Sequence, residues 1–416
     1  MEAVHLMENN QTEKALALLE SFLPSANEEE KYTIAELYMQ WGFLKEASAI
    51  LTELLRMYPD ENDIKVMLAD IYIELEEDEK AIDLLNDVNK ADPAYIQTLI
   101  QLADLYQAQG LFEVAEQKLL TAKQLEPNEL IIDFALGELF FSTGAYKKAI
   151  TYYEKIISDT REIANVSIDD RLAEAHAAAG NYEIALQYYQ NVDHEDTDTL
   201  FKYGFTAYHA NRKDIAIKSW EHIIEQDPYY HTVYYQLSKA YEEEELPQEA
   251  YTTAKKGLQF DEFNKELYFY TGVLAHQLND DTESEKYIRE AVVLDPDYKE
   301  AILFLIEIFK QKDRFSAIID LINDIKNVGA NDPLYDWEQA RAYVEIESYN
   351  DALNQYNEAY NSLKQDSDFL REYGYFLIEE GRSIQAISIF EDYLIQQPLD
   401  VEIEEYVNRL KQTNDS

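Results

Sequence analysis

Residues 102–127, LADLYQAQGLFEVAEQKLLTAKQLEP, decide the fold of this chain. Ala103 and Tyr106 lie three residues apart and therefore share one face of a helix. A glycine then marks a turn between two helical patterns. Ala115 belongs to the second pattern, which Pro127 closes because proline cannot continue a helix. The stretch therefore predicts two helices joined by a tight turn.

The same pattern recurs along almost the whole chain at an interval of about 34 residues. Pro59, Pro93 and Pro127 fall 34 residues apart, and each ends an apolar-periodic stretch. A small residue recurs in step with them at Ala15, Ala47, Ala81, Ala115, Ala149, Ala185, Ala216, Ala250, Ser284, Ala317, Ala352 and Ala386. A small side chain at a fixed place in each repeat indicates that two helices cross closely there. The period predicts a solenoid of helix pairs rather than one large core.

Blocks such as residues 102–127 and 136–156, LGELFFSTGAYKKAITYYEKI, resemble the tetratricopeptide repeat. The shared features are a small residue three before a larger one, a turn glycine, an aromatic residue, an alanine and a closing proline. This resemblance covers nearly the whole chain. It implies an all-α fold, a right-handed α-solenoid superhelix of about twelve helix-turn-helix repeats. A last helix, with Ile403, Val407 and Leu410 on one face, is predicted to cap the open end.

Two irregular places suggest how the repeats are grouped. Between Ser158 and Ser167 the closing proline is missing, and the segment VDHEDTDT at 192–199 shortens the next interval. We expect four parts: an N-terminal array with an acidic concave ladder at 1–160, an irregular repeat and possible joint at 161–196, a C-terminal array at 197–400, and a capping helix with a tail at 401–416. A locally adjusted superhelix without a joint is the alternative, because solenoids tolerate irregular loops.

The charge of the chain excludes several classes of partner. Lysine and arginine number 35 against 83 aspartates and glutamates, which gives a formal net charge of -48, although 46% of residues are hydrophobic. A surface this negative disfavours nucleic acids and anionic membranes.

The absence of cysteine excludes disulfides and thiolate-bound zinc. The start of the chain, MEAVHLMENNQTEK, has no export signal, so a cytoplasmic location and no membrane insertion are expected.

The resemblance implies that the first helix of each pair lines a concave groove. One residue past the small packing position, an acid recurs in five successive repeats: Glu36, Asp70, Asp104, Glu138 and Glu174. Four residues before the first four of these stand Tyr32, Val66, Ile100 and Phe134, on the same helical face. The combination predicts a groove that binds a basic, partly apolar protein segment. A merely solvated acidic face is the alternative, because unit charges about 10 Å apart in water repel by only about 0.4 kcal/mol.

Aromatic residues gather in the middle of the chain. Those predicted to face or rim the groove, where tyrosine makes an effective anchor, are Phe201, Tyr208, Tyr229, Tyr230 and Tyr235. Trp337 holds an equivalent groove position in a later repeat. Tyr203 and Trp220 fall at packing positions and are expected in the core.

No catalytic or cofactor motif stands out in the sequence. The seven histidines show no HExxH or other paired ligand spacing, and no phosphate loop, GxGxxG turn or GxSxG elbow occurs. Asp193, Glu195, Asp196 and Asp198 lack the ordered loop of an EF-hand. We therefore expect no enzyme, metal or cofactor, but a protein-interaction scaffold or adaptor. A peptide-sensing regulator is the second interpretation and an enzyme of unrecognised type the third, and the oligomeric state stays open.

Overall fold

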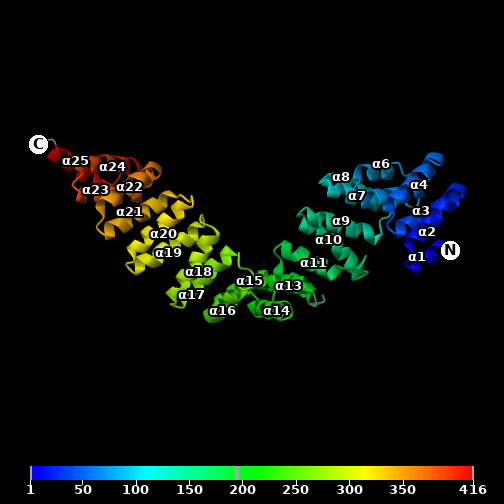
Figure 1. Cartoon of the computed structure of the whole chain (residues 1–416), viewed down its shortest axis with the longest axis horizontal. Coiled ribbons are helices and arrows are strands. Elements are labelled where there is room, and N and C mark those ends of the chain that lie inside the picture. The colour runs from blue at the N-terminus through cyan, green and yellow to red at the C-terminus, as the bar shows by residue number, and fades with distance from the viewer. Residues whose placement is uncertain (1, 193–195, 415–416) are drawn as a thin grey trace. The chain divides into compact units, whose positions relative to one another are not determined.

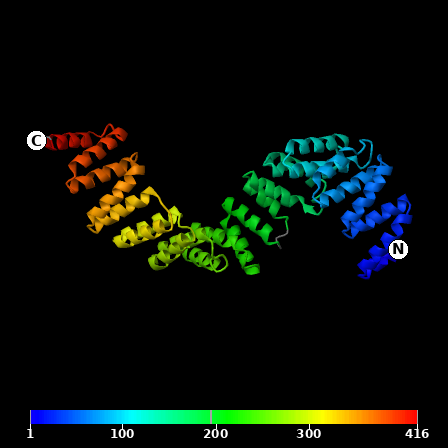
Figure 2. The same cartoon turned by 45° about the horizontal axis from the view of Figure 1, so that its top comes forward.

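The computed structural model describes residues 2–192 and 196–414, which are helical nearly throughout (Figure 1). The chain divides into two compact units, Met1–Asn211 (unit 1) and Arg212–Ser416 (unit 2). Within each unit, helices that follow one another in sequence pack side by side, in both views of the molecule (Figures 1 and 2). This arrangement is that of an α-helical solenoid, as predicted.

Unit 1 contains α1 (Glu2–Glu8), α2 (Thr12–Phe22), the short 3-10 helix η1 (Leu23–Ser25), α3 (Glu28–Gln40), α4 (Leu44–Met57), α5 (Asn62–Glu74), α6 (Asp78–Asn86), α7 (Tyr95–Ala108), α8 (Phe112–Leu125), α9 (Leu130–Ser142), α10 (Tyr146–Ile157), β1 (Glu162–Ile163), β2 (Val166–Ser167), α11 (Ile168–Ala178), α12 (Tyr182–Tyr189) and α13 (Thr197–His209). Odd-numbered helices are the first helices of the repeats, and even-numbered helices are the second.

Unit 2 contains α14 (Lys213–Gln226), α15 (Thr232–Glu243), α16 (Pro247–Gly257), α17 (Lys265–Gln277), α18 (Asp281–Leu294), α19 (Lys299–Gln311), α20 (Phe315–Asn327), α21 (Pro333–Glu345), α22 (Tyr349–Leu363), α23 (Ser367–Glu379), α24 (Ser383–Gln396) and α25 (Val401–Asn414). The last of these is the predicted cap. Ile403 and Val407 bury one of its faces against the end of the array.

The recurring small residue is a buried position in the second helix of nearly every repeat. With one exception every member of the predicted series is fully buried, and each is the fourth residue of its helix. The exception is Ala317, which is only partly buried, whereas its neighbour Ile318 is fully buried and is the fourth residue of α20. The prediction for Ala317 is therefore wrong by one residue, because a bulkier isoleucine holds the crossing in this repeat.

The turns between first and second helices all need a left-handed residue. Glycine supplies it in several repeats, for example at Gly110 with φ 75°, but Glu76 takes the place with φ 58° and Glu347 with φ 59°. The Glu77 amide donates to the Tyr72 carbonyl at 2.8 Å, which is the six-to-one bond of a Schellman motif. A residue with a Cβ carries strain in this conformation, because its Cβ crowds the following carbonyl.

Replacing Glu76 or Glu347 by glycine is therefore expected to raise the unfolding free energy by about 1 kcal/mol. Both side chains are exposed, so the backbone effect dominates. Urea unfolding followed by circular dichroism measures it. Glu74→Gly, two residues earlier and still helical, is the control and should lower the stability by up to about 1 kcal/mol. A similar shift in both variants would contradict the strain argument.

A small β-hairpin replaces the missing proline at the first irregular place. β1 and β2 pair antiparallel around Ala164 and Asn165, which both have positive φ, as a type I′ turn requires. Arg161 reaches Asp169 at 2.9 Å, and the Ser167 hydroxyl caps α11. Sequence periodicity missed this hairpin because it is shorter than any repeat signal. The possible joint at 161–196 stays a prediction, and Asp193, His194 and Glu195 lie outside the described residues.

Among the described residues, no helix is both long enough and apolar enough to cross a membrane.

Candidate partner-binding site

The first helices of successive repeats in unit 1 are linked to one another by polar side chains. Gln101 on α7 donates to Asp70 on α5 at 2.7 Å, and Arg171 on α11 reaches Glu138 on α9 at 3.1 Å. Lys202 on α13 pairs in the same way with an acid on α11. We call the surface formed by α3, α5, α7, α9, α11 and α13 the first-helix face of unit 1. It carries all five acids of the predicted ladder.

Three acids at the N-terminal end of this face have no cation beside them. Among the described residues, no ion pair joins a lysine or arginine to Glu36, Asp70 or Asp104. The lysines of α3 and α5 pair instead with carboxylates of the second helices, which we call the second-helix layer. Lys31 lies 2.8 Å from Glu53 on α4, and Lys65 lies 2.6 Å from Asp87 at the end of α6. α7 and α9 contain no lysine or arginine at all. This end of the face is therefore acidic and uncompensated.

Partial desolvation raises the pKa of two of these carboxyls. The pKa of Asp104 lies above its ordinary value of 3.8 because neighbouring side chains desolvate the carboxyl, although it still reaches the surface. Desolvation also raises the pKa of Asp70, with a further contribution from the charge of Glu74, and the hydrogen bond from Gln101 only partly opposes the shift. A raised pKa means that the ionised form is held at a cost, since water is partly excluded and no cation replaces it. A cation from outside would remove that cost.

The two acids at the other end of the ladder are already paired. Glu138 accepts a hydrogen bond from the Tyr153 hydroxyl at 2.6 Å and lies 3.1 Å from the Arg171 guanidinium. Glu174 is held by Arg171 at 2.8 Å and by Lys202. The prediction of five equivalent steering acids is corrected here, because internal cations neutralise two of them. Three unpaired acids remain, on α3, α5 and α7.

The predicted apolar stripe beside the ladder is mostly part of the core. Ile100 is only 7% exposed, so the prediction that it contacts a partner is corrected. Tyr32, Val66 and Phe134 are half-buried and pack against core clusters between neighbouring helices. Their exposed edges still reach the face, but they offer little free apolar surface.

An apolar hollow lies farther along the same face, beyond the paired acids. It has a volume of about 290 Å³, and its walls include Phe141 from α9, Ala177 from α11, and Phe201 and Phe205 from α13. Phe205 is 39% exposed. Of these four, sequence reasoning named only Phe201 as a contact. The signal was available. Phe205 occupies the ladder position of its own repeat, and Phe141 lies one turn beyond Glu138, the ladder residue of α9.

The other central aromatics divide between surface and core. Tyr229 is 75% exposed with its ring edge against Phe260, and Tyr235 is half-buried against Tyr270. Tyr208 and Tyr230 are half-buried too. Trp220 is fully buried, as predicted, and Tyr203 is half-buried against Tyr189. A partner-binding role for Tyr208, Tyr229, Tyr230 and Tyr235 stays a prediction.

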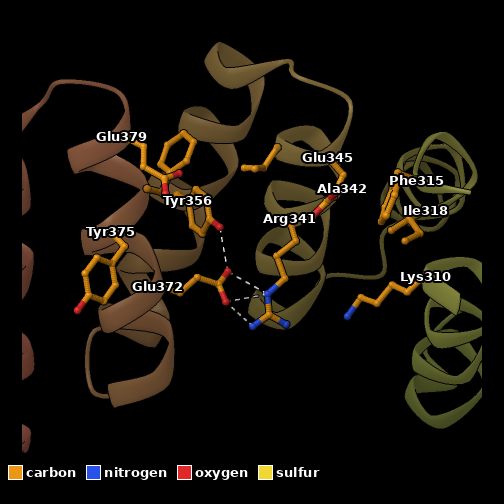
Figure 3. A pocket seen from close by; sticks show the side chains of 12 residues that line it. Lys310, Phe315, Ile318, Arg341, Ala342, Glu345, Tyr356, Glu372, Tyr375 and Glu379 are labelled. Carbon is orange, nitrogen blue, oxygen red and sulfur yellow. Dashed lines mark hydrogen bonds and ion pairs between the residues drawn. The ribbon is translucent and has the colours of Figure 1, made fainter. Parts of the chain in front are cut away.

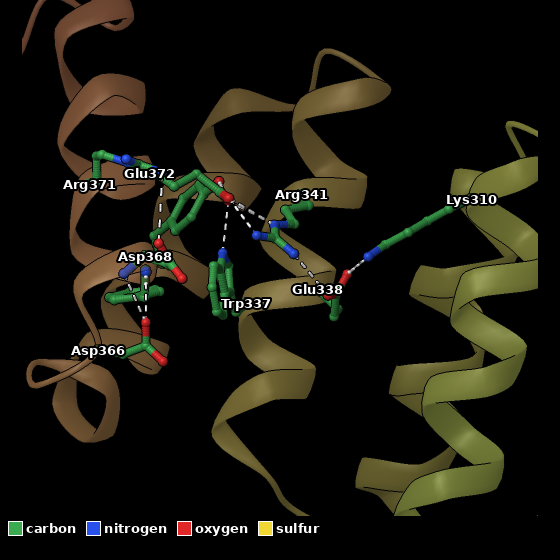
Figure 4. Close-up of polar contacts among 10 residues, drawn as sticks. Lys310, Trp337, Glu338, Arg341, Asp366, Asp368, Arg371 and Glu372 are labelled. Carbon is green, nitrogen blue, oxygen red and sulfur yellow. Dashed lines mark hydrogen bonds and ion pairs between the residues drawn. The ribbon is translucent and has the colours of Figure 1, made fainter.

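Trp337 is buried, so its predicted place in the groove is corrected. Its indole nitrogen donates to Glu372 at 2.8 Å, and the Arg341 guanidinium lies 4.0 Å above its ring (Figure 4). The Glu372 carboxylate also accepts hydrogen bonds from the Arg341 guanidinium at 2.6 Å and from the Tyr356 hydroxyl at 2.9 Å. The indole is therefore a structural link between α21 and α23 rather than an open contact.

A larger cavity opens above this network in unit 2. Its volume is about 560 Å³, and it lies between α19 and α20 on one side and α23 on the other, with α21 and Tyr356 of α22 behind it (Figure 3). It presents both charged and apolar side chains.

Among residues 2–192 and 196–414, no group of three or more histidine, aspartate or glutamate side chains is placed to hold a metal ion.

A curated protein of Bacillus subtilis (strain 168), "TPR repeat-containing protein YpiA", is 39% identical to this chain over 412 residues. The match covers 99% of the chain and 97% of that protein. The chain belongs to the YpiA-like tetratricopeptide repeat proteins. Family models agree: residues 333–400 match the YpiA-like C-terminal tetratricopeptide repeats, residues 107–160 the YpiA-like tetratricopeptide repeats, and residues 42–101 a general tetratricopeptide repeat.

Solved structures similar to this tetratricopeptide repeat protein share little sequence with it. A tetratricopeptide repeat protein from Parabacteroides merdae ATCC 43184 is 15% identical with a TM-score of 0.43, and the match covers 59% of the chain and 98% of that protein. YrrB, described as a TPR protein with an unusual peptide-binding site, is 14% identical with a TM-score of 0.38, over 44% of the chain and 95% of that protein.

Membership of the family supports the general expectation from the sequence. Tetratricopeptide repeat proteins are protein-interaction scaffolds and are typically non-catalytic.

Proposed function

We propose that the chain is a scaffold that holds a basic, partly apolar segment of a partner protein against the first-helix face of unit 1. The observation that carries this proposal is the row of three unpaired acids, Glu36, Asp70 and Asp104, on a stretch of helices whose lysines all point to the other layer. Internal pairing of Glu138 and Glu174 limits the acidic stretch to the N-terminal end.

The energetics favour lysine or arginine as the ligand of this stretch. An exposed ion pair contributes up to about 1 kcal/mol, and a charge-assisted hydrogen bond in a partly desolvated place contributes somewhat more. Three such contacts would supply about 3 kcal/mol, which corresponds to about 100-fold in affinity. The charge of the whole chain adds steering, so association should slow as salt rises.

The apolar part of the partner segment would enter the hollow bordered by α9, α11 and α13. Phe141, Phe201 and Phe205 present aromatic surface there, and burying one apolar side chain between them contributes about 1.5–3 kcal/mol. Basic residues would thus contact α3, α5 and α7, and an apolar anchor would follow toward α13. Release of the partner should depend on the anchor, because buried contacts mainly set the off-rate.

The test is fluorescence anisotropy of a labelled peptide of lysine and leucine with the full chain, at low and at moderate salt. The combined variant Glu36→Gln, Asp70→Asn, Asp104→Asn is expected to bind about 100-fold more weakly, because three contacts of about 1 kcal/mol each are lost. Phe205→Ala should speed dissociation, and a peptide of glutamate and leucine should bind the native chain about 100-fold more weakly than the basic peptide.

The matched control changes three acids on the second helices of the same repeats, Glu46→Gln, Asp83→Asn and Glu113→Gln. All three side chains are exposed, and among the described residues none has an ion pair. Equal loss of binding in both triple variants would reject the first-helix face as the site, since net charge alone would then explain the affinity.

A further inference from the structure

The cavity in unit 2 has an apolar floor. Its apolar lining includes Phe315 and Ile318 from α20, Val344 from α21 and Phe376 from α23. Phe315 and Val344 are half-buried, whereas Ile318 and Phe376 are buried. Figure 3 shows Phe315 and Ile318 on one side of the cavity, opposite Tyr375. Ile318 is the residue that replaces the usual small side chain at the helix crossing of its repeat. At about 560 Å³ the space is large enough for a long side chain and its neighbour.

The two cations that line the cavity are already neutralised. Arg341 donates to both oxygens of Glu372, at 2.9 Å and 2.6 Å, and to Glu338 at 3.0 Å. Lys310 lies 2.5 Å from the same Glu338 (Figure 4). An anionic ligand would have to break these pairs and leave carboxylates unpaired, which is strongly unfavourable. The cavity is therefore not built for a phosphate or a carboxylate.

Two other carboxylates line the cavity and are uncompensated. Glu345 and Glu379 are exposed, and among the described residues neither makes an ion pair or a hydrogen bond through its side chain. They are the last residues of α21 and α23, where the negative end of the helix dipole already favours a positive charge. Tyr375, 41% exposed, lies on the same side of the cavity as Glu379 (Figure 3).

We propose that this cavity receives an arginine side chain, together with an apolar neighbour, from a protein partner. Glu345 and Glu379 would pair with the guanidinium, and the ring of Tyr375 would stack on it, since arginine is planar and pairs with carboxylates and aromatic faces at once. The apolar neighbour would cover the half-buried ring of Phe315. The site is separate from the first-helix face of unit 1 and does not depend on it.

The test uses the full chain carrying Glu36→Gln, Asp70→Asn and Asp104→Asn, so that binding at the first-helix face cannot mask the result. A labelled peptide with one arginine between leucines is titrated by fluorescence anisotropy. Adding Glu345→Gln and Glu379→Gln is expected to weaken binding about tenfold, and Tyr375→Ala to weaken it by about threefold.

The control pair is Glu358→Gln and Glu380→Gln, two exposed acids of the same unit outside the cavity, which should change the affinity by less than about twofold. A peptide with glutamine in place of arginine should bind the chain with intact Glu345 and Glu379 as weakly as the arginine peptide binds the variant in which both are glutamine. The proposal is overturned if the chain with Glu345→Gln and Glu379→Gln binds the arginine peptide as tightly as the control does. It is also overturned if the glutamine peptide binds as tightly as the arginine peptide. A third contradicting result is that the chain with only its Glu36, Asp70 and Asp104 changes does not bind the arginine peptide.

Discussion

Replacing Glu372 by alanine is expected to lower the unfolding free energy of unit 2 by about 3 kcal/mol, the largest single-site loss of stability that we foresee. The carboxylate satisfies the buried indole N–H of Trp337 and the buried hydroxyl of Tyr356, at 2.8 Å and 2.9 Å. Removing it leaves both donors without their acceptor, and each unpaired buried group costs about 1–3 kcal/mol. Arg341 also loses its two-fold pairing, although part of that charge reaches water.

Acid should reveal the same network in the unaltered chain. Burial acts to raise the pKa of Glu372, but the hydrogen bonds from Arg341 and Trp337 and the charge of Arg341 prevail and hold it below the ordinary 4.5. A carboxyl whose pKa is lowered by folding stabilises the folded chain at any pH above the pKa that it has in the unfolded chain. That stability is lost as the pH falls through the pKa of the folded chain. The gap between the native chain and Glu372→Gln should therefore close as the pH falls below 4.5.

Urea unfolding of both variants, with hydrogen exchange to locate the loss in α21 to α23, measures these effects. The control is Glu380→Ala, an exposed acid at the end of α23, which should change stability by less than about 0.5 kcal/mol. A loss in Glu372→Ala no larger than in this control would mean that the indole and the tyrosine hydroxyl find other partners.

The architecture of the chain follows from its sequence because the repeat period fixes it. A buried small residue every 34 or so residues sets where each helix pair crosses, and within residues 2–192 and 196–414 the series departs from that rule only at Ile318. The hairpin formed by β1 and β2 could not be foreseen, since two-residue strands have no hydrophobic period. Its turn residues Ala164 and Asn165 carry only a weak signal, because asparagine tolerates positive φ and alanine does not favour it.

The charge state of the ladder was harder to predict, although the sequence contains a usable signal. Side chains that link successive first helices are 28 residues apart, as Lys202 and Glu174 are, 31 apart, as Gln101 and Asp70 are, or 33 apart, as Arg171 and Glu138 are. Applied forward along the ladder, these three spacings find a cation for Glu138 and for Glu174 and none for the other three acids. The period of the fold thus predicts which acids are internally paired, once the offset between neighbouring helices is known.

Burial at the groove positions escaped sequence reasoning for a different reason. Trp337 was expected to be open because it lies on the first-helix face of its repeat. The side chain of Glu372, one repeat later, reaches back to it, and Arg341 covers its ring. Contacts of this kind depend on how two repeats are stacked, which no single repeat encodes.

Reversing the three unpaired acids, with Glu36→Lys, Asp70→Lys and Asp104→Lys, is expected to exchange the peptide preference of unit 1. The native chain should favour a peptide of lysine and leucine over one of glutamate and leucine by about 100-fold, and the reversed chain should favour the acidic peptide by about tenfold. The swing is about 1000-fold rather than symmetric, because the rest of the chain stays strongly acidic and continues to repel anions.

The control for this reversal is Glu46→Lys, Asp83→Lys and Glu113→Lys, which gives the same net charge with the lysines on α4, α6 and α8. Packed helices are about 8–10 Å apart, which is close to the screening length at physiological salt, so charges of the second-helix layer act only weakly on a ligand at the first-helix face. Competition between the two peptides in one anisotropy assay compares the variants directly. If the control exchanges the preference as strongly, the overall charge selects the partner, and the positions of Glu36, Asp70 and Asp104 do not.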